Sequence, residues 1–190
     1  MINNIKLTGK AITINESRTN KGPAAKVKLY IVSNGRIYTP KVKFTGDLAK
    51  KILDNKNLYL SCTMSVTANI NKYKIKARGV YITELVANSF KTDIEDDVQS
   101  GTYFDGMILE GIIKDFYEIT PGITSILIGN GDDLEHQLNI NVDIFAPVSA
   151  IRQKIGDKVL VKGIVGTREK KLKDEAINEL RFISYSIKNL

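Results

Sequence analysis

The 190-residue sequence contains no tryptophan, one cysteine (Cys62) and one histidine (His136). A single cysteine allows neither an internal disulfide nor a cysteine-based zinc site, and it suits a reducing cytosol. The sequence also lacks a Walker-type phosphate loop and any cluster of His and Cys at metal-ligand spacing. We therefore predict a protein that is not an enzyme, with no catalytic residues, no cofactor and no metal.

A long hydrophobic run is also missing. No stretch approaches the roughly 18 apolar residues of a membrane span, and residues 1–4 lack the basic-then-apolar pattern of a signal peptide. Hydrophobic residues make up 43% of the chain and charged residues 26%, a composition typical of one or two small globular domains. We expect a cytoplasmic protein with no membrane partner.

Acidic residues are scarce in the first half of the chain. Residues 1–88 contain 16 Lys and Arg against 4 Asp and Glu, a net charge of +12. Residues 89–105 have a net charge of −4, and residues 106–190 have 11 basic against 12 acidic residues, a net charge of −1. A basic segment beside a nearly neutral one indicates a polyanionic partner for the first segment alone.

The same residue pattern occurs twice, about 101 residues apart. Residues 42–60 and 142–161 each show a strand-like run, a short amphipathic stretch and a second strand-like run. The other matched landmarks are Phe44 with Phe145, Tyr81 and Ile82 with Phe182 and Ile183, and, with one residue of slip, Gly9 with Gly111. A period this long indicates a duplicated domain, because solenoid repeats run roughly 20–50 residues.

Alternating apolar and polar residues predict five strands and one short helix in each copy. In the first copy the strands are predicted at residues 5–14, 25–32, 36–44, 58–66 and 73–82, with a loop at 15–23 and a helix at 47–53. In the second copy they are predicted at residues 107–117, 124–128, 138–145, 158–166 and 177–187, with a helix at 147–155. A helix between the third and fourth of five strands is the order of an OB fold, a Greek-key barrel.

We therefore predict an all-β protein of two tandem OB-fold five-stranded barrels, each with one short helix. Residues 1–88 form the basic, nucleic-acid-binding domain, residues 89–105 an acidic linker, and residues 106–190 a nearly neutral domain with an architectural or interaction role. A single large β-sandwich is the alternative, and the two helices in corresponding positions argue against it.

Strand parity identifies the candidate binding residues, because successive side chains point to opposite faces of a strand. Three strands of the first copy are predicted to carry outward rows of cations, and OB folds bind nucleic acid on this surface. Single-strand binding also needs aromatic rings on which bases stack. The candidates are Arg18, Lys21, Lys26, Lys28, Tyr30, Arg36, Tyr38, Lys41, Lys43, Tyr59, Lys72, Tyr73, Lys74, Lys76 and Arg78.

Parity also leaves some alternatives open. Tyr59 is predicted to point outward from the fourth strand, whereas Tyr38 and Tyr73 match the parity of core residues as well, and Tyr81 is predicted to lie in the core. The second copy has no Lys or Arg at 124–128, so we predict that it packs, dimerises or binds a partner. Its basic segment at 168–173 either extends the path of a bound strand or is a solvated hairpin tip.

Residues 42–49, Val-Lys-Phe-Thr-Gly-Asp-Leu-Ala, followed by 56–60, Lys-Asn-Leu-Tyr-Leu, resemble the core of bacterial and phage single-stranded DNA-binding proteins. That family tends to read V-x-F-x-G-x-L-A before a short helix and a strand. The resemblance implies an OB-fold protein that binds single-stranded DNA without strong sequence preference and protects it in replication, repair and recombination. It also implies that Lys26, Lys28, Tyr30, Lys41, Lys43 and residues 72–78 face DNA.

The chain departs from that family in two respects. It has none of the family's stacking tryptophans, and residues 186–190 are not the acidic tail that recruits replication enzymes. Two copies per chain resemble the members that dimerise, so we expect a homodimer. The Lys-, Asn- and Ile-rich composition suits a phage or mobile-element gene expressed in a bacterial cell.

The leading hypothesis is a non-enzymatic protein that coats single-stranded DNA through a basic OB groove with stacking tyrosines, and replication proteins are possible further partners. One alternative is an RNA-binding OB module, because OB grooves bind RNA equally readily. Another is a structural protein or replisome adaptor whose basic face meets an acidic protein.

Overall fold

The computed structural model describes residues 3–20, 22–33, 35–75, 80–92, 105–129, 138–172 and 175–190. The chain forms two compact units. One unit spans Ile5–Asp105, and the other comprises Gly106–Leu190 together with the N-terminal residues. No helix in the described part of the chain is long and apolar enough to cross a bilayer.

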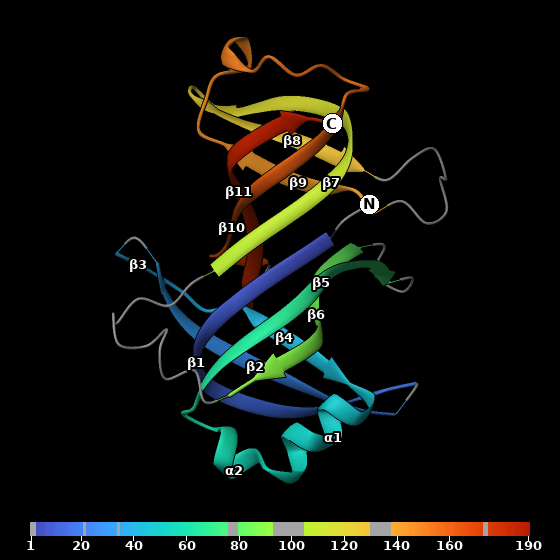
Figure 1. Ribbon diagram of the computed structural model, residues 1–190, viewed down its shortest axis with the longest axis vertical. Coiled ribbons are helices and arrows are strands. Elements are labelled where there is room, and N and C mark those ends of the chain that lie inside the picture. The colour runs from blue at the N-terminus through green and yellow to red at the C-terminus, as the bar shows by residue number, and fades with distance from the viewer. Residues whose placement is uncertain are drawn as a thin grey trace. The chain divides into compact units, whose positions relative to one another are not determined.

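The first unit consists mostly of strands, with two short helices (Figure 1). Its elements are β1 (Asn3–Thr19), β2 (Gly22–Ser33), β3 (Arg36–Tyr38), β4 (Lys41–Thr45), α1 (Gly46–Asp54), α2 (Lys56–Tyr59), β5 (Thr63–Ile75) and β6 (Val80–Lys91). The long strands pair in the order β1-β5-β6-β4-β2, and β2 pairs with β1. The sheet therefore closes into a five-stranded barrel, in which β4 and β6 are parallel and the other neighbours are antiparallel.

The second unit repeats this topology. Its elements are β7 (Asp105–Thr120), β8 (Ile123–Gly129), β9 (Ile140–Ile144), the 3₁₀ turn η1 (Val148–Ala150), β10 (Lys158–Leu172) and β11 (Glu175–Asn189). The strands pair in the order β7-β10-β11-β9-β8, and β8 pairs with β7. The parallel pair is again the third and fifth strand, β9 with β11. The protein is therefore all-β, with two tandem OB folds.

Strict alternation in β2 fills the first barrel, because Val27, Leu29 and Ile31 are fully buried there. The helix α1 contributes Ala49 and Ile52 to the same core. Phe90, near the end of β6, meets the rings of Phe44 and Tyr59 edge to face, with centroids 5.6 and 5.5 Å away. Edge-to-face packing is a favoured geometry for aromatic rings. The predicted domain boundary at residue 88 falls inside β6, which continues to Lys91.

Gly9 and Gly111 occupy equivalent places on the first strand of each barrel. A Cβ atom on Gly9 would lie 2.6 Å from the backbone oxygen of Tyr30, and one on Gly111 would lie 2.8 Å from that of Gly129. These distances are shorter than a van der Waals contact, so only glycine fits the strand crossing. The predicted correspondence of the two glycines is thus confirmed.

Several predicted boundaries were wrong. Residues 15–20 are not loop, because β1 continues to Thr19 and forms a hairpin with β2, in which Thr19 pairs with Gly22. Residues 67–72, which were predicted to separate two strands, lie within β5, and the hairpin strands end at Ile75 and Val80. Long twisted strands can carry polar residues where they are exposed to solvent, so a polar segment does not by itself indicate a loop or turn.

The second predicted helix was also wrong. Residues 147–155 contain only the 3₁₀ turn η1, with Val148 and Ile155 exposed to 40% and 63%. The predicted offset of 101 residues was wrong for the third and fifth strands. Phe182 is the counterpart of Leu85 and not of Tyr81. Strand register places Val142 at the position of Val42, and Phe145 is exposed to 61% whereas Phe44 is fully buried.

Substituting Gly9 or Gly111 with Ala should lower the free energy of unfolding by about 1–3 kcal/mol, because the new methyl group enters the neighbouring backbone. Urea denaturation measures the change. Lys6→Ala, at an exposed position on β1, is the control and should change the free energy by less than about 0.5 kcal/mol. Wild-type stability in both glycine variants would contradict the close crossing.

Candidate nucleic-acid interface

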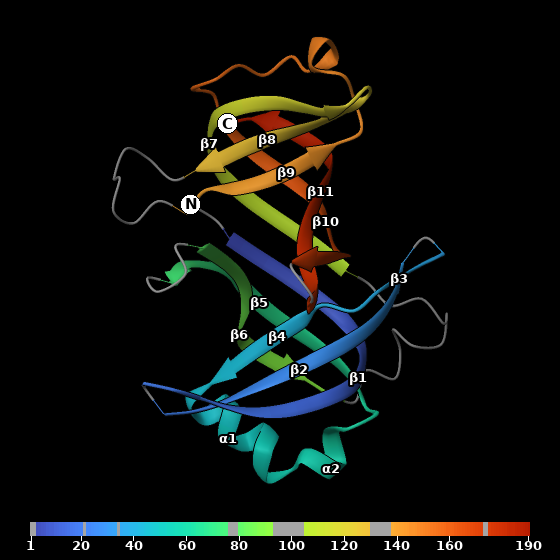
Figure 2. The ribbon, with the colours of Figure 1, turned by 180° about the vertical axis from the view of Figure 1, so that it is seen from behind.

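The outer surface of β2 and β4 carries two pairs of lysines, and these strands lie side by side in Figure 2. Lys26 lies directly opposite Lys43, and Lys28 directly opposite Lys41. Their neighbours Val27 and Val42 are buried in the barrel, so the four lysines point outward. Tyr30 lies on the same face of β2, two residues beyond Lys28, and is half-buried. We call these five residues the basic face.

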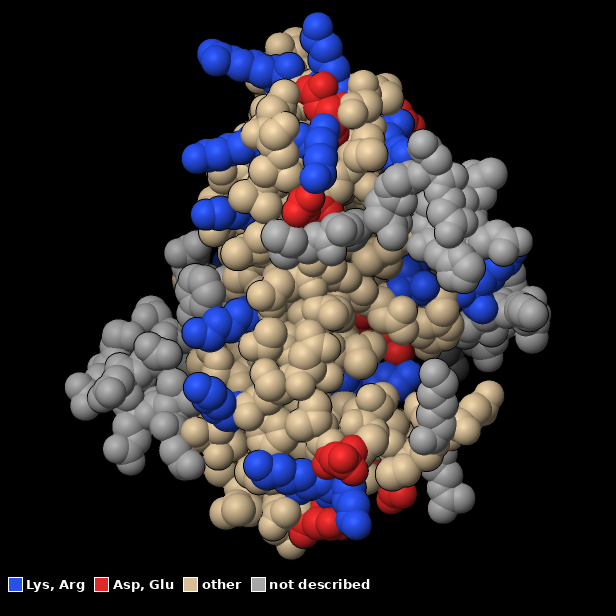
Figure 3. Space-filling view, turned by 45° about the vertical axis from the view of Figure 1, so that its right-hand side comes forward, with Lys and Arg blue, Asp and Glu red and all other residues tan. Residues whose placement is uncertain are grey.

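Like charges that face each other across two strands destabilise a sheet. Within the described residues, only Lys43 of these four lysines takes part in an ion pair, with Glu84 at 2.8 Å. The end of the unit that carries α1 and α2 is different, because acidic and basic side chains mix there (Figure 3). The repulsion is therefore concentrated on the basic face, where a polyanion would relieve it.

The β5–β6 hairpin carries two exposed rings on opposite faces. Tyr73 is exposed to 38%, and Nζ of Lys43 lies 6.0 Å from its ring centroid. Tyr81 is exposed to 61% and has Nζ of Lys72 and of Lys74 at 5.5 and 5.7 Å. Ammonium groups at this range are held by cation–π attraction. Both rings thus combine a flat surface with nearby positive charge.

Tyr81 was predicted to lie in the core, and that prediction was wrong. The hairpin extends further along the chain than expected, so Tyr81 faces Lys74 across the two strands. Partial burial lowers the pKa of Lys72 below its ordinary value. A correct strand register would have identified Tyr81, because it lies on the same face as two lysines.

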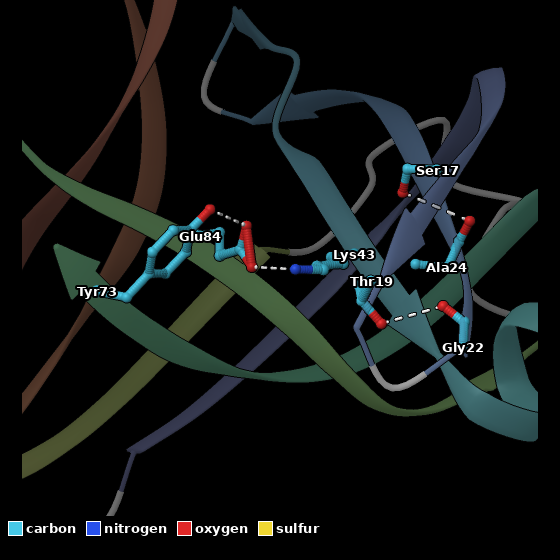
Figure 4. A network of polar contacts seen from close by, with 7 residues as sticks. All are labelled: Ser17, Thr19, Gly22, Ala24, Lys43, Tyr73 and Glu84. Atoms are coloured by element: carbon cyan, nitrogen blue, oxygen red, sulfur yellow. Dashed lines mark hydrogen bonds and ion pairs between the residues drawn. The ribbon is translucent and has the colours of Figure 1, made fainter. Parts of the chain in front are cut away.

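Glu84 joins the basic face to the hairpin (Figure 4). Its Oε2 atom accepts a hydrogen bond from Nζ of Lys43 at 2.8 Å, and its Oε1 atom accepts one from the Tyr73 hydroxyl at 3.2 Å. Burial raises the pKa of the Tyr73 phenol, and the charge and hydrogen bond of Glu84 raise it further, whereas Lys43 lowers it. The three side chains come from β4, β5 and β6, so one carboxylate connects three strands.

The other candidate residues fall into three groups. Tyr38 and Tyr59 are exposed to only 8% and 7%. Tyr38 therefore takes the core alternative that its parity left open. Tyr59 lies in α2 instead of at an outward strand position, so its predicted place on the surface was wrong. The ring of Tyr59 meets that of Phe90 edge to face. Arg36 is exposed at the start of β3. Lys21, Lys76, Arg78 and the side chain of Arg18 lie outside the described residues.

Equivalent strand register gives the counterpart of each interface residue in the second barrel. None of the four lysines has a basic counterpart, and glycine replaces Tyr30. The pairs are Lys26 with Ser125, Lys28 with Leu127, Tyr30 with Gly129, Lys41 with Asn141, Lys43 with Asp143, Tyr73 with Arg168 and Glu84 with Arg181. The second barrel therefore keeps the framework of the basic face without its charge.

The ion pair across the parallel strands is present in both barrels with its charges exchanged. Arg181 donates to Asp143 through Nε at 2.9 Å and also through Nη2, whereas Lys43 donates to Glu84 in the first barrel. Asp143 is exposed to only 7% and Ser125 is fully buried. An acid covered by its own arginine offers no site for phosphate.

Comparison with known proteins supports the fold assignment. No protein-family model and no curated protein matches the chain. Its structure is similar to that of the wild-type single-stranded DNA-binding protein from Thermus aquaticus, with a TM-score of 0.72 and 13% identity over 100% of this chain and 93% of that one. A deletion mutant of the Thermus protein matches with a TM-score of 0.71 and 14% identity over 100% and 94%. The shared feature is the fold.

Two of the candidate tyrosines, Tyr30 and Tyr59, differ in burial, which predicts different effects when each is replaced. Tyr30→Ala should weaken binding of a single-stranded oligonucleotide by about fivefold or more, because a lost stacking ring is worth on the order of 1–3 kcal/mol, and should leave stability nearly unchanged. Tyr59→Ala should instead lower the free energy of unfolding by about 2–4 kcal/mol with binding unchanged. Fluorescence anisotropy and urea denaturation measure the two quantities. The reverse pattern would contradict both assignments.

Proposed function

We propose that the protein is a non-enzymatic single-stranded DNA-binding protein that binds through its first barrel. The observation that carries this proposal is the pair of facing lysine pairs, Lys26 with Lys43 and Lys28 with Lys41. Facing lysines lower the stability of the free protein. Bound phosphates neutralise these lysines, and the counterions that the phosphates release favour binding. The second barrel repeats the fold and replaces all four lysines, so the basic face is not a requirement of the fold.

Two rings on this surface favour a single strand as the ligand over a duplex. Tyr30 on the basic face and Tyr73 on the hairpin lie beside lysines, and unpaired bases stack on such rings while cations contact the backbone. Bases within a duplex are already stacked on one another and cannot use them. The sequence resemblance to single-stranded DNA-binding proteins and the fold shared with the Thermus protein support this choice.

In this proposal the first barrel coats and protects DNA strands exposed during replication, recombination and repair. The second barrel is architectural, because its equivalent face is covered by the Arg181–Asp143 pair. Formation of a homodimer through the second barrel and contacts with replication proteins stay predictions. An RNA strand presents the same phosphates and stackable bases, so RNA is the alternative ligand that binding experiments have to test.

Reversing three lysines of the basic face, K26E/K28E/K41E, should abolish binding to oligo(dT) at moderate salt. Lys43 is left in place because a Glu there would face Glu84 and destabilise the fold. At low salt, any residual binding should depend less on salt. The slope of log K, the binding constant, against log salt concentration should be less negative by about 2, since each of the three lost phosphate contacts contributes about 0.7. Fluorescence anisotropy over a range of salt concentrations measures both.

The matched control is K154E/K162E/K188E, which makes the same change in net charge at exposed positions of the second barrel. It should retain most of the wild-type affinity, apart from a weak long-range effect. Equal loss of binding in the two triple variants would show that net charge, not the basic face, controls binding. Wild-type affinity in K26E/K28E/K41E would place the binding surface elsewhere.

Ligand choice forms a separate prediction. The protein should bind oligo(dT) more tightly than a duplex of the same length at the same salt, because only the single strand supplies free base surfaces. Competition with unlabelled duplex and with oligo(U) measures the preference. Equal competition by duplex would contradict the single-strand proposal, whereas stronger competition by oligo(U) would favour the RNA alternative.

A further inference from the structure

The presence of Glu84 on a face proposed to bind a polyanion needs an explanation. A carboxylate beside a phosphate path repels the ligand, and Glu84 lies between β4 and β5 within hydrogen-bonding reach of both. Its side chain is exposed to only 12%, so it is fixed in place instead of extending into solvent. Each of its two oxygens accepts a hydrogen bond from a different side chain, Lys43 or Tyr73 (Figure 4).

The geometry points to Glu84 as a positioning residue that holds the ring of Tyr73 ready for a base. This inference rests on the proposed function and adds to it the means by which one stacking ring is oriented. Tyr73 lies toward the end of β5, where a strand side chain exposed to 38% would otherwise sample several rotamers. Restricting those rotamers before binding reduces the entropy lost on binding.

The strand arrangement explains how one carboxylate reaches both partners. Lys43 pairs with Val86 in the parallel ladder, and Glu84 is two residues earlier on the same face of β6. Tyr73 of β5 pairs with Ile82 of β6 in the antiparallel ladder. Glu84 is two residues beyond Ile82, so it is the diagonal neighbour of Tyr73. Diagonal neighbours on one face are within reach of long side chains. Backbone register therefore places the acid between the lysine and the tyrosine.

The second barrel shows that an ion pair can join the two parallel strands with its acid and its cation exchanged. In the second barrel the acid, Asp143, is on β9, and the cation, Arg181, is on β11. The residue at the position of Tyr73 is Arg168, which pairs with Glu179 at 2.8 Å instead. In the first barrel the carboxylate on β6 that pairs with Lys43 also lies beside the tyrosine and accepts its hydroxyl hydrogen bond.

A double-mutant cycle tests the inference. Glu84→Ala should weaken binding to oligo(dT) by about threefold to tenfold even though it removes a negative charge, because the ring loses its orientation. Tyr73→Ala should weaken binding by about fivefold or more, and the E84A/Y73A variant should bind no more weakly than Y73A. Glu179→Ala makes the same charge change in an exposed ion pair of the second barrel and should leave affinity unchanged.

Two results would overturn the inference. Tighter binding by E84A would mean that Glu84 is merely a repulsive charge, and effects of E84A and Y73A that multiply would mean that the acid acts independently of the ring. Urea denaturation establishes that each variant is folded under the assay conditions. If E84A unfolds, Glu84→Gln replaces it in the cycle, because Gln keeps the size and one acceptor oxygen of Glu but loses the charge. The E84Q variant should weaken binding by less than about threefold, and its effect should still be coupled to that of Tyr73→Ala.

A measurement without nucleic acid separates this inference from the proposed function. The phenol of Tyr73 can be titrated by the difference in ultraviolet absorbance between a protein and its Y73F variant. Because the charge and hydrogen bond of Glu84 help to raise the pKa of that phenol, the pKa should fall when the same difference is measured in the E84Q background. An unchanged pKa would overturn the contact itself, whereas failure of wild-type protein to bind oligo(dT) would overturn the proposed function and leave the contact intact.

Discussion

The parallel contact between β4 and β6 closes the first barrel, and the arrangement of the candidate interface depends on it. Few residues form this ladder, with Val42 opposite Leu85 and Lys43 opposite Val86. Closure brings the outward faces of β2, β4, β6 and β5 into one continuous surface, because each strand keeps its alternation of buried and outward residues. Four lysines and two tyrosines from segments far apart in the sequence therefore share a surface.

The two barrels separate the requirements of the fold from those of binding. Both keep a glycine where the first strand crosses the second, and both keep an ion pair across the parallel strands. Only the first barrel keeps facing lysines, which a stable sheet would avoid. A feature that opposes stability and is absent from the duplicate is best explained by a ligand that neutralises it. The asymmetry in charge thus has a structural basis at individual positions.

Sequence alone predicted the two barrels and the outward direction of Lys26, Lys28 and Lys41, because a buried strand with strict alternation determines its own parity. It failed at the β5–β6 hairpin, where residues 67–72 were predicted to separate two strands and Tyr81 was predicted to lie in the core. It also failed at Tyr59, since a short helix and a strand look alike over four residues. The Glu84 contacts depend on register between strands, which no local pattern reveals.

The first barrel is proposed to bind a single strand, and the second is proposed not to bind one through its corresponding face. Amide chemical shifts, followed by nuclear magnetic resonance while oligo(dT) is added to the whole protein, test this claim residue by residue. Binding through the basic face should produce large shift changes along β2, β4 and the β5–β6 hairpin, with β8 and β9 unchanged. Shift changes of equal size on β8 and β9, or none on β2 and β4 at saturating oligonucleotide, would contradict it.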